Sequence, residues 1–227
     1  MKTWAQTSSC EFDKYAIKSY NAIHGTNFET SDIRELKGED LGIEDTDKYT
    51  YIMTYSFPCQ DLSLAGNQKG MQKGSGTRSG LLWEVERLLN ETAELPQILL
   101  MENVPQVIGE KNIKDFAKWI DALEKMGYRN YWQVLNAKDY GIPQNRERCF
   151  MVSVLGDYYY EFPKPMKLEK RLKDLLEPSV EEKYYLSDSQ VTSIMANCES
   201  RRERGAFNAV FAPTEGGDSE KRHHKTR

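Results

Sequence analysis

The sequence has few of the residues that form disulfide frameworks or metal sites. Its 227 residues include four cysteines and three histidines. No two cysteines have the CxxC spacing, and two of the histidines lie at the carboxyl end, so neither a disulfide framework nor a metal site is indicated. The sequence also lacks an apolar run of the ~18 residues that a membrane span needs, and it does not begin with a signal peptide. We therefore expect a cytoplasmic protein that does not enter a membrane.

The sequence does contain short apolar runs that alternate with segments of helical periodicity. Three runs are apolar and uninterrupted, as buried parallel strands tend to be: residues 51–55, 98–101 and 149–155. An earlier strand is expected to end within residues 5–10. The spacing of apolar residues predicts helices over 13–24, 79–89, 113–126 and 187–198. This pattern predicts an α/β fold with a doubly wound, mostly parallel, Rossmann-like sheet, and a functional site at the carboxyl ends of its strands.

Three polar segments adjoin these apolar runs. They are Phe57-Pro58-Cys59-Gln60, Glu102-Asn103-Val104 and Gln144-Asn145-Arg146-Glu147-Arg148. A cysteine after a proline can present a thiolate nucleophile, a glutamate can hold or protonate a polar ring edge, and paired arginines can bind carbonyl or phosphate oxygens. Together they suit a planar, electron-poor heterocycle. Structural roles stay open for single residues, such as a small buried side chain for Cys59 and a cap for Glu102.

These segments, with Asp139-Tyr140-Gly141-Ile142-Pro143, closely resemble the C5-cytosine DNA methyltransferases of bacterial restriction-modification systems and phages. The resemblance runs from about Cys10 to Leu176. It implies that a target cytosine leaves the duplex and that Cys59 attacks its C6 atom. It further implies that Glu102 holds the N3 and amino edge, that Arg148 contacts O2, and that Arg146 binds a flanking phosphate or supports the loop. Gln144 and Asn145 are interpreted as structural.

The resemblance also implies a site for S-adenosylmethionine. Glu11 matches the acidic residue that takes the ribose hydroxyls, and Phe12 would stack on the adenine. Asp32, followed by Ile33, would accept from the adenine amino group, while Pro58 and Leu82 would complete the wall. From the residues alone, Glu11 is equally well explained as a negative charge placed before a helix.

Parts of the family pattern are not found in this sequence. The family opens with a strand and an FxGxG turn, and it continues after the third motif through a long target-recognition domain. We therefore expect a partial catalytic domain over residues 1–176, without its first strand, and the start of a target-recognition region over 177–227. The last twelve residues, 216–227, contain no apolar side chain, which favours a disordered tail over the alternative of a shifted reading frame. An unpaired strand edge would favour self-association.

The charge balance is acidic, with 35 acidic against 31 basic residues. Five basic residues nevertheless gather around the predicted site: Lys69, Lys73, Arg78, Arg146 and Arg148. Because phosphate neutralisation supplies most of the affinity for DNA, we expect this chain alone to bind double-stranded DNA weakly and without sequence preference. Two other functions stay open. The glycine-rich run 66–80 could cradle a phosphate, although no GK[ST] follows it, and the chain could be a non-catalytic partner or gene remnant that keeps the fold.

The isolated 227-residue chain is predicted not to methylate DNA. Correct placement of two reactants lowers the activation barrier by about 7 to 11 kcal/mol. The glycine-rich turn that would position the cofactor is not found in this sequence, so this contribution is expected to be lost. Transfer of a tritiated methyl group from S-adenosylmethionine to mixed-sequence DNA measures this, with Cys59→Ala as the background. Incorporation above that background would overturn the prediction.

Overall fold

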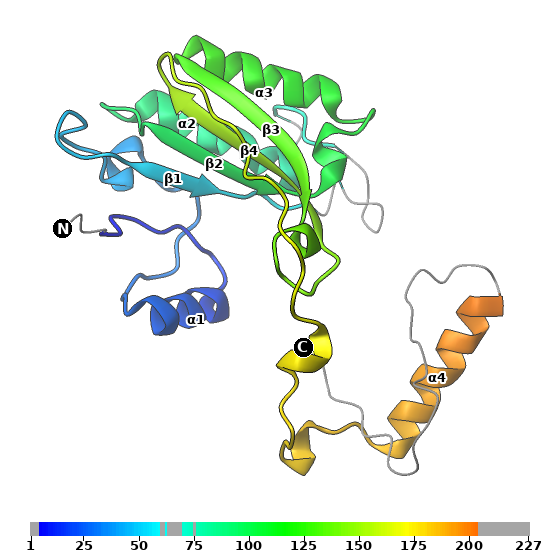
Figure 1. Ribbon diagram of the computed structural model, residues 1–227. Helices are drawn as coiled ribbons and strands as arrows, with labels where there is room; N and C mark the ends of the chain where they lie inside the picture. The colour runs from blue at the N-terminus through cyan, green and yellow to red at the C-terminus, as the bar shows by residue number, and fades with distance from the viewer. Residues whose placement is uncertain (1–4, 60–61, 63–69, 75, 204–227) are drawn as a thin grey trace. The chain divides into compact units, whose positions relative to one another are not determined.

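The α/β fold is built around one mixed sheet. The computed structural model describes residues 5–59, 62, 70–74 and 76–203, and of these the side chains of 200–203 are left out. The chain divides into two compact units, Met1–Arg171 and Leu172–Arg227. Among its described residues, the first unit contains the sheet and three α-helices (Figure 1). The division into a catalytic domain over 1–176 and a target-recognition region beyond it stays a prediction.

The sheet has the strand order β1-β2-β4-β3. Its strands are β1 (Ile52–Tyr55), β2 (Ile98–Asn103), β3 (Tyr128–Asn136) and β4 (Glu147–Leu155). The α/β class is as expected, but the mostly parallel pairing is corrected: β1 and β2 are parallel, whereas β4 is antiparallel to both β2 and β3. The segment 137–146 between β3 and β4 is too short for the crossover that parallel neighbours require, so β4 runs antiparallel to β3. Because β3 runs in the same direction as β2, β4 is antiparallel to β2 as well.

Strand β3 was not predicted, and the strand expected within residues 5–10 does not form. Polar Arg129, Asn130 and Gln133 interrupt the apolar pattern of β3, which lies at the edge of the sheet. Residues 5–10 pair with no strand among the described residues, and the adjoining Glu11 carbonyl accepts a hydrogen bond from Ser31 N at 2.9 Å instead. Both differences arise because a strand forms where a neighbouring strand is available to pair with it, and the local sequence pattern does not specify that neighbour.

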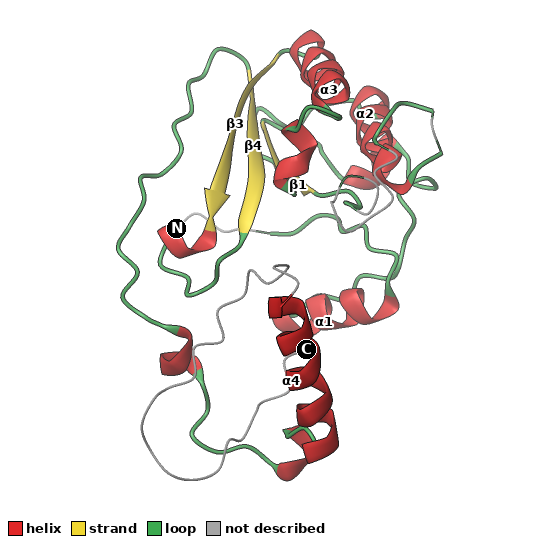
Figure 2. Ribbon diagram, turned by 90° about the vertical axis from the view of Figure 1, so that its right-hand side faces the viewer, coloured by secondary structure: helices red, strands yellow, loops and turns green. Residues whose placement is uncertain are grey.

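The helices lie close to their predicted positions. They are α1 (Lys14–His24), α2 (Leu82–Glu91), α3 (Ile113–Lys125) and, in the second unit, α4 (Asp188–Glu203). Asp13 caps α1 by accepting hydrogen bonds from Tyr15 N and Ala16 N, and Gly25 ends it with a φ of 66°. Helices α2 and α3 lie side by side on one face of the sheet (Figures 1 and 2). Short 3₁₀ helices connect the elements: Gly38–Leu41, Arg78–Leu81, Pro105–Ile108, Ala137–Asp139, Leu172–Leu175 and Glu182–Tyr184.

The hydrophobic core lies between the sheet and the α2–α3 layer. Leu99 and Met101 of β2 are fully buried, as is Trp119 of α3. The Trp119 indole N–H donates to the hydroxyl of Tyr55 at 3.1 Å, which satisfies both buried polar groups. Burial raises the pKa of this tyrosine, so its hydroxyl stays protonated. Helix α3 therefore packs against the ends of β1 and β2 and fixes their position.

Among the glycines in the described part of the chain, Gly38 is predicted to be the most sensitive to alanine substitution. It begins a 3₁₀ helix that lies against the end of α2, and a Cβ there would be 2.3 Å from Thr92 N, a backbone atom. Urea denaturation of Gly38→Ala should show a free energy of unfolding lowered by about 3 kcal/mol. The matched control is Gly25→Ala, where the space is open and only the left-handed φ costs about 1 to 2 kcal/mol. Equal losses in the two variants would contradict the packing argument.

Candidate active site

The predicted acid lies where β1 and β2 end side by side. In the parallel register Tyr55 pairs with Met101, so the following residues, Ser56 and Glu102, come from neighbouring strands at the same edge. The Ser56 hydroxyl donates to Glu102 Oε2 at 3.3 Å. The Glu102 carboxyl is about one-third exposed and can be reached from solvent.

Both predicted arginines lie against the Glu102 carboxylate. Arg148 Nε is 2.8 Å from Glu102 Oε1, and Arg146 Nη2 is 3.8 Å from the same oxygen. The antiparallel register explains the contact: Glu102 pairs with Phe150, so Arg148, two residues away, is on the same face at the adjoining position. The third motif thus reaches the second because β4 begins where β2 ends.

The Cys59 loop is fixed by the residue after Glu102. Asn103 is 2% exposed, and its side-chain Nδ2 donates to the Phe57 carbonyl at 2.9 Å, while its Oδ1 accepts from Val104 N at 2.9 Å. Cys59 itself is half-buried, and its carbonyl accepts from Leu62 N at 3.0 Å. Gln60 lies outside the described residues. The sequence assigned no function to Asn103. The available signal was an asparagine at the end of an apolar strand, directly after the predicted acid, because a buried amide there needs hydrogen-bond partners.

A second buried asparagine holds the arginine-bearing loop. Asn136, at the end of β3, accepts from Arg146 N at 3.1 Å through Oδ1 and donates to Asn145 Oδ1 at 2.7 Å. The Ala137 amide also donates to the Arg146 carbonyl at 3.0 Å. Asn145 thus has the structural kind of contact expected for it. Asn136 was missed because it lies in the unpredicted strand β3.

Three of the predicted cofactor residues gather at a second location, around the start of α1. The Ser31 amide donates to the Glu11 carbonyl. This contact brings Asp32, the residue after Ser31, close to Glu11. Arg87 of α2 donates through Nη2 to the Ile33 carbonyl at 2.9 Å, which ties this segment to the helix layer. The Glu11 carboxylate accepts from Asp13 N at 2.8 Å through one oxygen.

The remaining cofactor assignments differ in how far their side chains can be reached. The Phe12 ring is 78% exposed, whereas Leu82 is 0% exposed and belongs to the hydrophobic core. Leu82 therefore has no surface with which to contact a ligand here, and its role as part of the wall is corrected to a packing role. The Asp32 carboxylate is bound by the Arg34 guanidinium and amide, and these hydrogen bonds lower the pKa of Asp32 to about 2.

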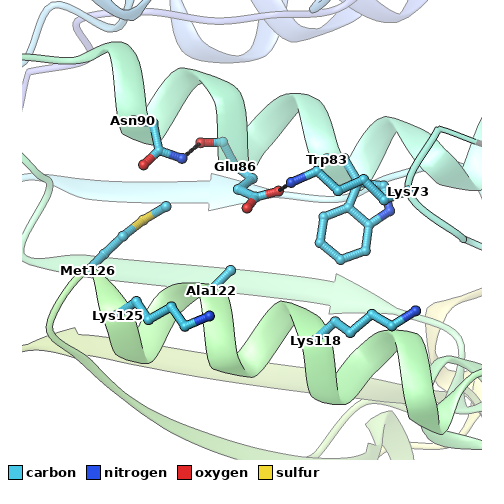
Figure 3. Close-up of a pocket in the computed structure, with 8 residues that line it drawn as sticks. All are labelled: Lys73, Trp83, Glu86, Asn90, Lys118, Ala122, Lys125 and Met126. Atoms are coloured by element: carbon cyan, nitrogen blue, oxygen red, sulfur yellow. Dashed lines mark hydrogen bonds and ion pairs between the residues drawn. The ribbon is translucent and has the colours of Figure 1, made fainter.

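Lys73 lies in a surface groove between α2 and α3. The groove has a volume of about 290 Å³, and Figure 3 shows its lining: Lys73, Trp83, Glu86, Asn90, Lys118, Ala122, Lys125 and Met126. Lys73 forms an ion pair with Glu86, and its Nζ is 5.3 Å from the centre of the Trp83 ring. The expectation that Lys73 adds positive charge to the active site is therefore corrected: a carboxylate already neutralises it. Lys69 lies outside the described residues.

Comparisons with known proteins identify the family of this chain. A model of the family described as C-5 cytosine-specific DNA methylase matches residues 3–225. The chain is 47% identical over 142 residues to the type II methyltransferase M2.ScrFI of Lactococcus lactis subsp. cremoris, which covers 62% of this chain and 39% of that protein. It is also 47% identical over 173 residues to the orphan methyltransferase M.SssI of Spiroplasma monobiae, covering 74% and 43% respectively.

The fold is shared with a solved structure as well. The Dnmt2 methyltransferase of S. pombe superposes with a TM-score of 0.61 at 21% identity, over 84% of this chain and 57% of that one. The chain belongs to the C-5 cytosine-specific DNA methylase family, because the family model matches nearly its whole length. The resemblance inferred from its motifs is confirmed. The chain spans less than half the length of the two curated relatives named above.

The length of a helix and its polarity bear on membrane insertion. Across the part of the chain that the structure describes, no helix is both long enough and apolar enough to cross a bilayer.

Cys59 is predicted to be the thiol that iodoacetamide alkylates fastest near neutral pH. It is half-buried on the loop after β1, whereas Cys149 is fully buried, and burial raises the pKa of the Cys149 thiol to about 11. Cys10 is an exposed residue, but its thiol donates to the Ser31 carbonyl, and desolvation raises the pKa of the Cys10 thiol, which disfavours the reactive thiolate. Peptide mass spectrometry over a time course ranks the four cysteines. Cys59→Ser should remove the fastest phase, and fastest labelling of Cys149 or Cys198 would contradict the assignment.

Proposed function

We propose that this protein is a DNA (cytosine-5)-methyltransferase that acts on a cytosine turned out of double-stranded DNA, with Cys59 as the nucleophile. The observation that carries the proposal is the joint placement of two motifs by consecutive residues of β2. Glu102 binds Arg148 at 2.8 Å, and Asn103 holds the backbone carbonyl two residues before Cys59 at 2.9 Å. A nucleophile and an acid fixed to the same strand end can act on two edges of one ring.

The chemistry begins with a bond between Cys59 Sγ and C6 of the cytosine. The electron pair of the C5–C6 double bond moves into the ring, and Glu102 balances it by a hydrogen bond or a proton at N3. The C5 atom thereby becomes nucleophilic. The methyl group would come from the sulfonium of S-adenosylmethionine, whose sulfur would keep the electron pair of the broken S–C bond and leave as a thioether. A solvent base then takes the C5 proton, and the electron pair of that C–H bond forms the C5–C6 double bond. The C–S bond breaks, the thiolate of Cys59 is restored, and a proton given to N3 returns to Glu102.

Arg148 and Arg146 orient the base in this proposal. A guanidinium has five N–H donors in a fixed plane, which is more than the contact with Glu102 uses, so Arg148 can also donate to the cytosine O2. Arg146 is farther from Glu102, at 3.8 Å, and its side chain is about half exposed, which suits a flanking phosphate. Asn136 fixes the backbone of Arg146 for that contact.

S-adenosylmethionine fits the side chains around the start of α1. The exposed Phe12 ring offers a stacking surface for the adenine, and Glu11 uses only one carboxylate oxygen for the Asp13 amide. The pair of Asp32 with Arg34 lies at the surface and costs little to rearrange, so Asp32 can accept from an amino group. Ile33 and Pro58 would complete this site. When bound, the cofactor supplies the methyl group.

Two interactions complete the proposal. Double-stranded DNA is the partner, bound weakly by this chain because its charge is acidic. The chain also associates with itself through β1, which lies at one end of the strand order and has a single strand neighbour among the described residues.

The function is tested by exchange of the hydrogen at C5. Addition of Cys59 to C6 makes C5 basic, so a tritium atom at C5 of cytosine in DNA is replaced by a solvent proton when the adduct forms and reverses. The wild-type chain should release tritium into water without S-adenosylmethionine, whereas Cys59→Ala should not. Glu102→Gln should reduce the rate roughly 100-fold or more, since it removes an acid.

This assay needs no cofactor, so it is independent of whether the isolated chain transfers methyl groups. Arg129→Gln is the matched control, since Arg129 forms an ion pair with Asp157 at the other end of β3. It should leave the rate unchanged. Equal tritium release by wild type and Cys59→Ala would refute the proposed nucleophile.

A further inference from the structure

The two peptide carbonyls immediately before Cys59 are held by buried side chains from two different elements. The Phe57 carbonyl accepts from Asn103 Nδ2 at 2.9 Å, and the Pro58 carbonyl accepts from the Ser79 hydroxyl at 2.5 Å. Asn103 ends β2, and Ser79 lies in the 3₁₀ helix that leads into α2. Their exposed fractions are 2% and 0%, so neither side chain is a surface contact.

Other constraints leave this loop little freedom. The Phe57 ring is 5% exposed and anchored in the core, and the ring of Pro58 fixes its own φ. With both carbonyl directions set as well, the backbone that carries Cys59 has one orientation, and the position of Sγ depends mainly on the side-chain torsion of Cys59. A misplacement of about 1 Å in a reacting group can cost roughly 100-fold in rate.

We propose that Ser79 and Asn103 are positioning residues for Cys59, which together aim its sulfur at the base. This inference rests on the proposed function. Ser79 is the less expected of the two, because it lies twenty residues beyond the nucleophile and the sequence assigned no role to its side chain. Its hydroxyl acts through the Pro58 carbonyl and not on the substrate.

Ser153 shows that a buried serine in this core need not have such a role. It is 0% exposed, like Ser79, but its hydroxyl has no hydrogen-bond partner among the described residues. Ser153 lies in β4 on the face that packs against the helices, paired with Leu99 of β2. Ser153→Ala therefore removes the same atom from an equally buried position without releasing a carbonyl, and it is the matched control.

The first measurement is alkylation of Ser79→Ala by iodoacetamide, followed at each cysteine. Release of the Pro58 carbonyl should loosen the loop, so labelling of Cys59 should become several-fold faster. Cys149 is fully buried in β4 and reports opening of the whole domain, so its labelling rate should not change. Ser153→Ala should match the wild type at both cysteines.

The second measurement is tritium release from C5 of cytosine in DNA. Ser79→Ala should lower kcat roughly 10- to 100-fold with an unchanged KM for DNA, since the sulfur is misdirected while the binding groups stay in place. A sulfur that is easier for a small reagent to reach and yet slower in catalysis indicates positioning. Asn103→Asp, which keeps the acceptor for Val104 N but loses the donor to Phe57, should behave in the same way and serves if Ser79→Ala does not fold.

The outcomes separate the two proposals. If the wild type releases no tritium, the proposed function fails, and the alkylation arm still decides the role of Ser79. If Cys59 and Cys149 label faster together, the serine only stabilises the domain and the positioning role is overturned. Unchanged labelling of Cys59 in both variants overturns it too.

Discussion

The antiparallel pairing of β2 with β4 is the constraint on which the site depends. It places the start of one strand beside the end of the other, so that Arg148 meets Glu102 at 2.8 Å although they are separated by more than forty residues in the sequence. A parallel pairing would have carried the arginine to the opposite edge of the sheet. The short connection after β3, which cannot cross over the sheet, enforces this direction. The chemistry of the third motif is therefore a consequence of topology.

Buried asparagine side chains at the ends of strands hold the adjoining loops in place. Asn103 and Asn136 end β2 and β3. Asn136 uses both polar side-chain atoms on the loop before β4, whereas Asn103 donates to the loop after β1 and accepts from the amide of the next residue, Val104. A buried polar group left without a partner costs about 1 to 3 kcal/mol, so these contacts hold each loop in one conformation. Solvent still reaches the groups proposed to react, since Glu102, Arg148 and Arg146 are partly exposed and Cys59 is half-buried. The buried side chains hold the loops, and the groups proposed for the chemistry are partly exposed.

Ion pairs decide where unneutralised charge is left on the surface, and the position of a charged residue in the sequence does not show this. Lys73 pairs with Glu86 in the groove between α2 and α3, and Arg34 pairs with Asp32 beside the segment proposed to bind the cofactor. Exposed pairs of this kind contribute about 0 to 1 kcal/mol to stability, so they can exchange partners when a ligand arrives. The Glu102–Arg148 pair is less exposed and is supported by Ser56 and Arg146 as well. It is the pair proposed to act in catalysis.

The sequence by itself determined the family and the helices, and it predicted the proposed nucleophile, acid and arginines, because these depend on short motifs and on local periodicity. It identified three of the four strands that the structure describes, since apolar runs mark buried strands regardless of their partners. Only the tertiary structure decided the mixed direction of the sheet, the presence of β3 with its polar residues, and the loss of the strand expected within residues 5–10. It also decided that Leu82 packs in the core and that Asn103, Asn136 and Ser79 hold the loops. Strand direction and burial are set by contacts between residues far apart in the chain, and a local pattern does not contain them.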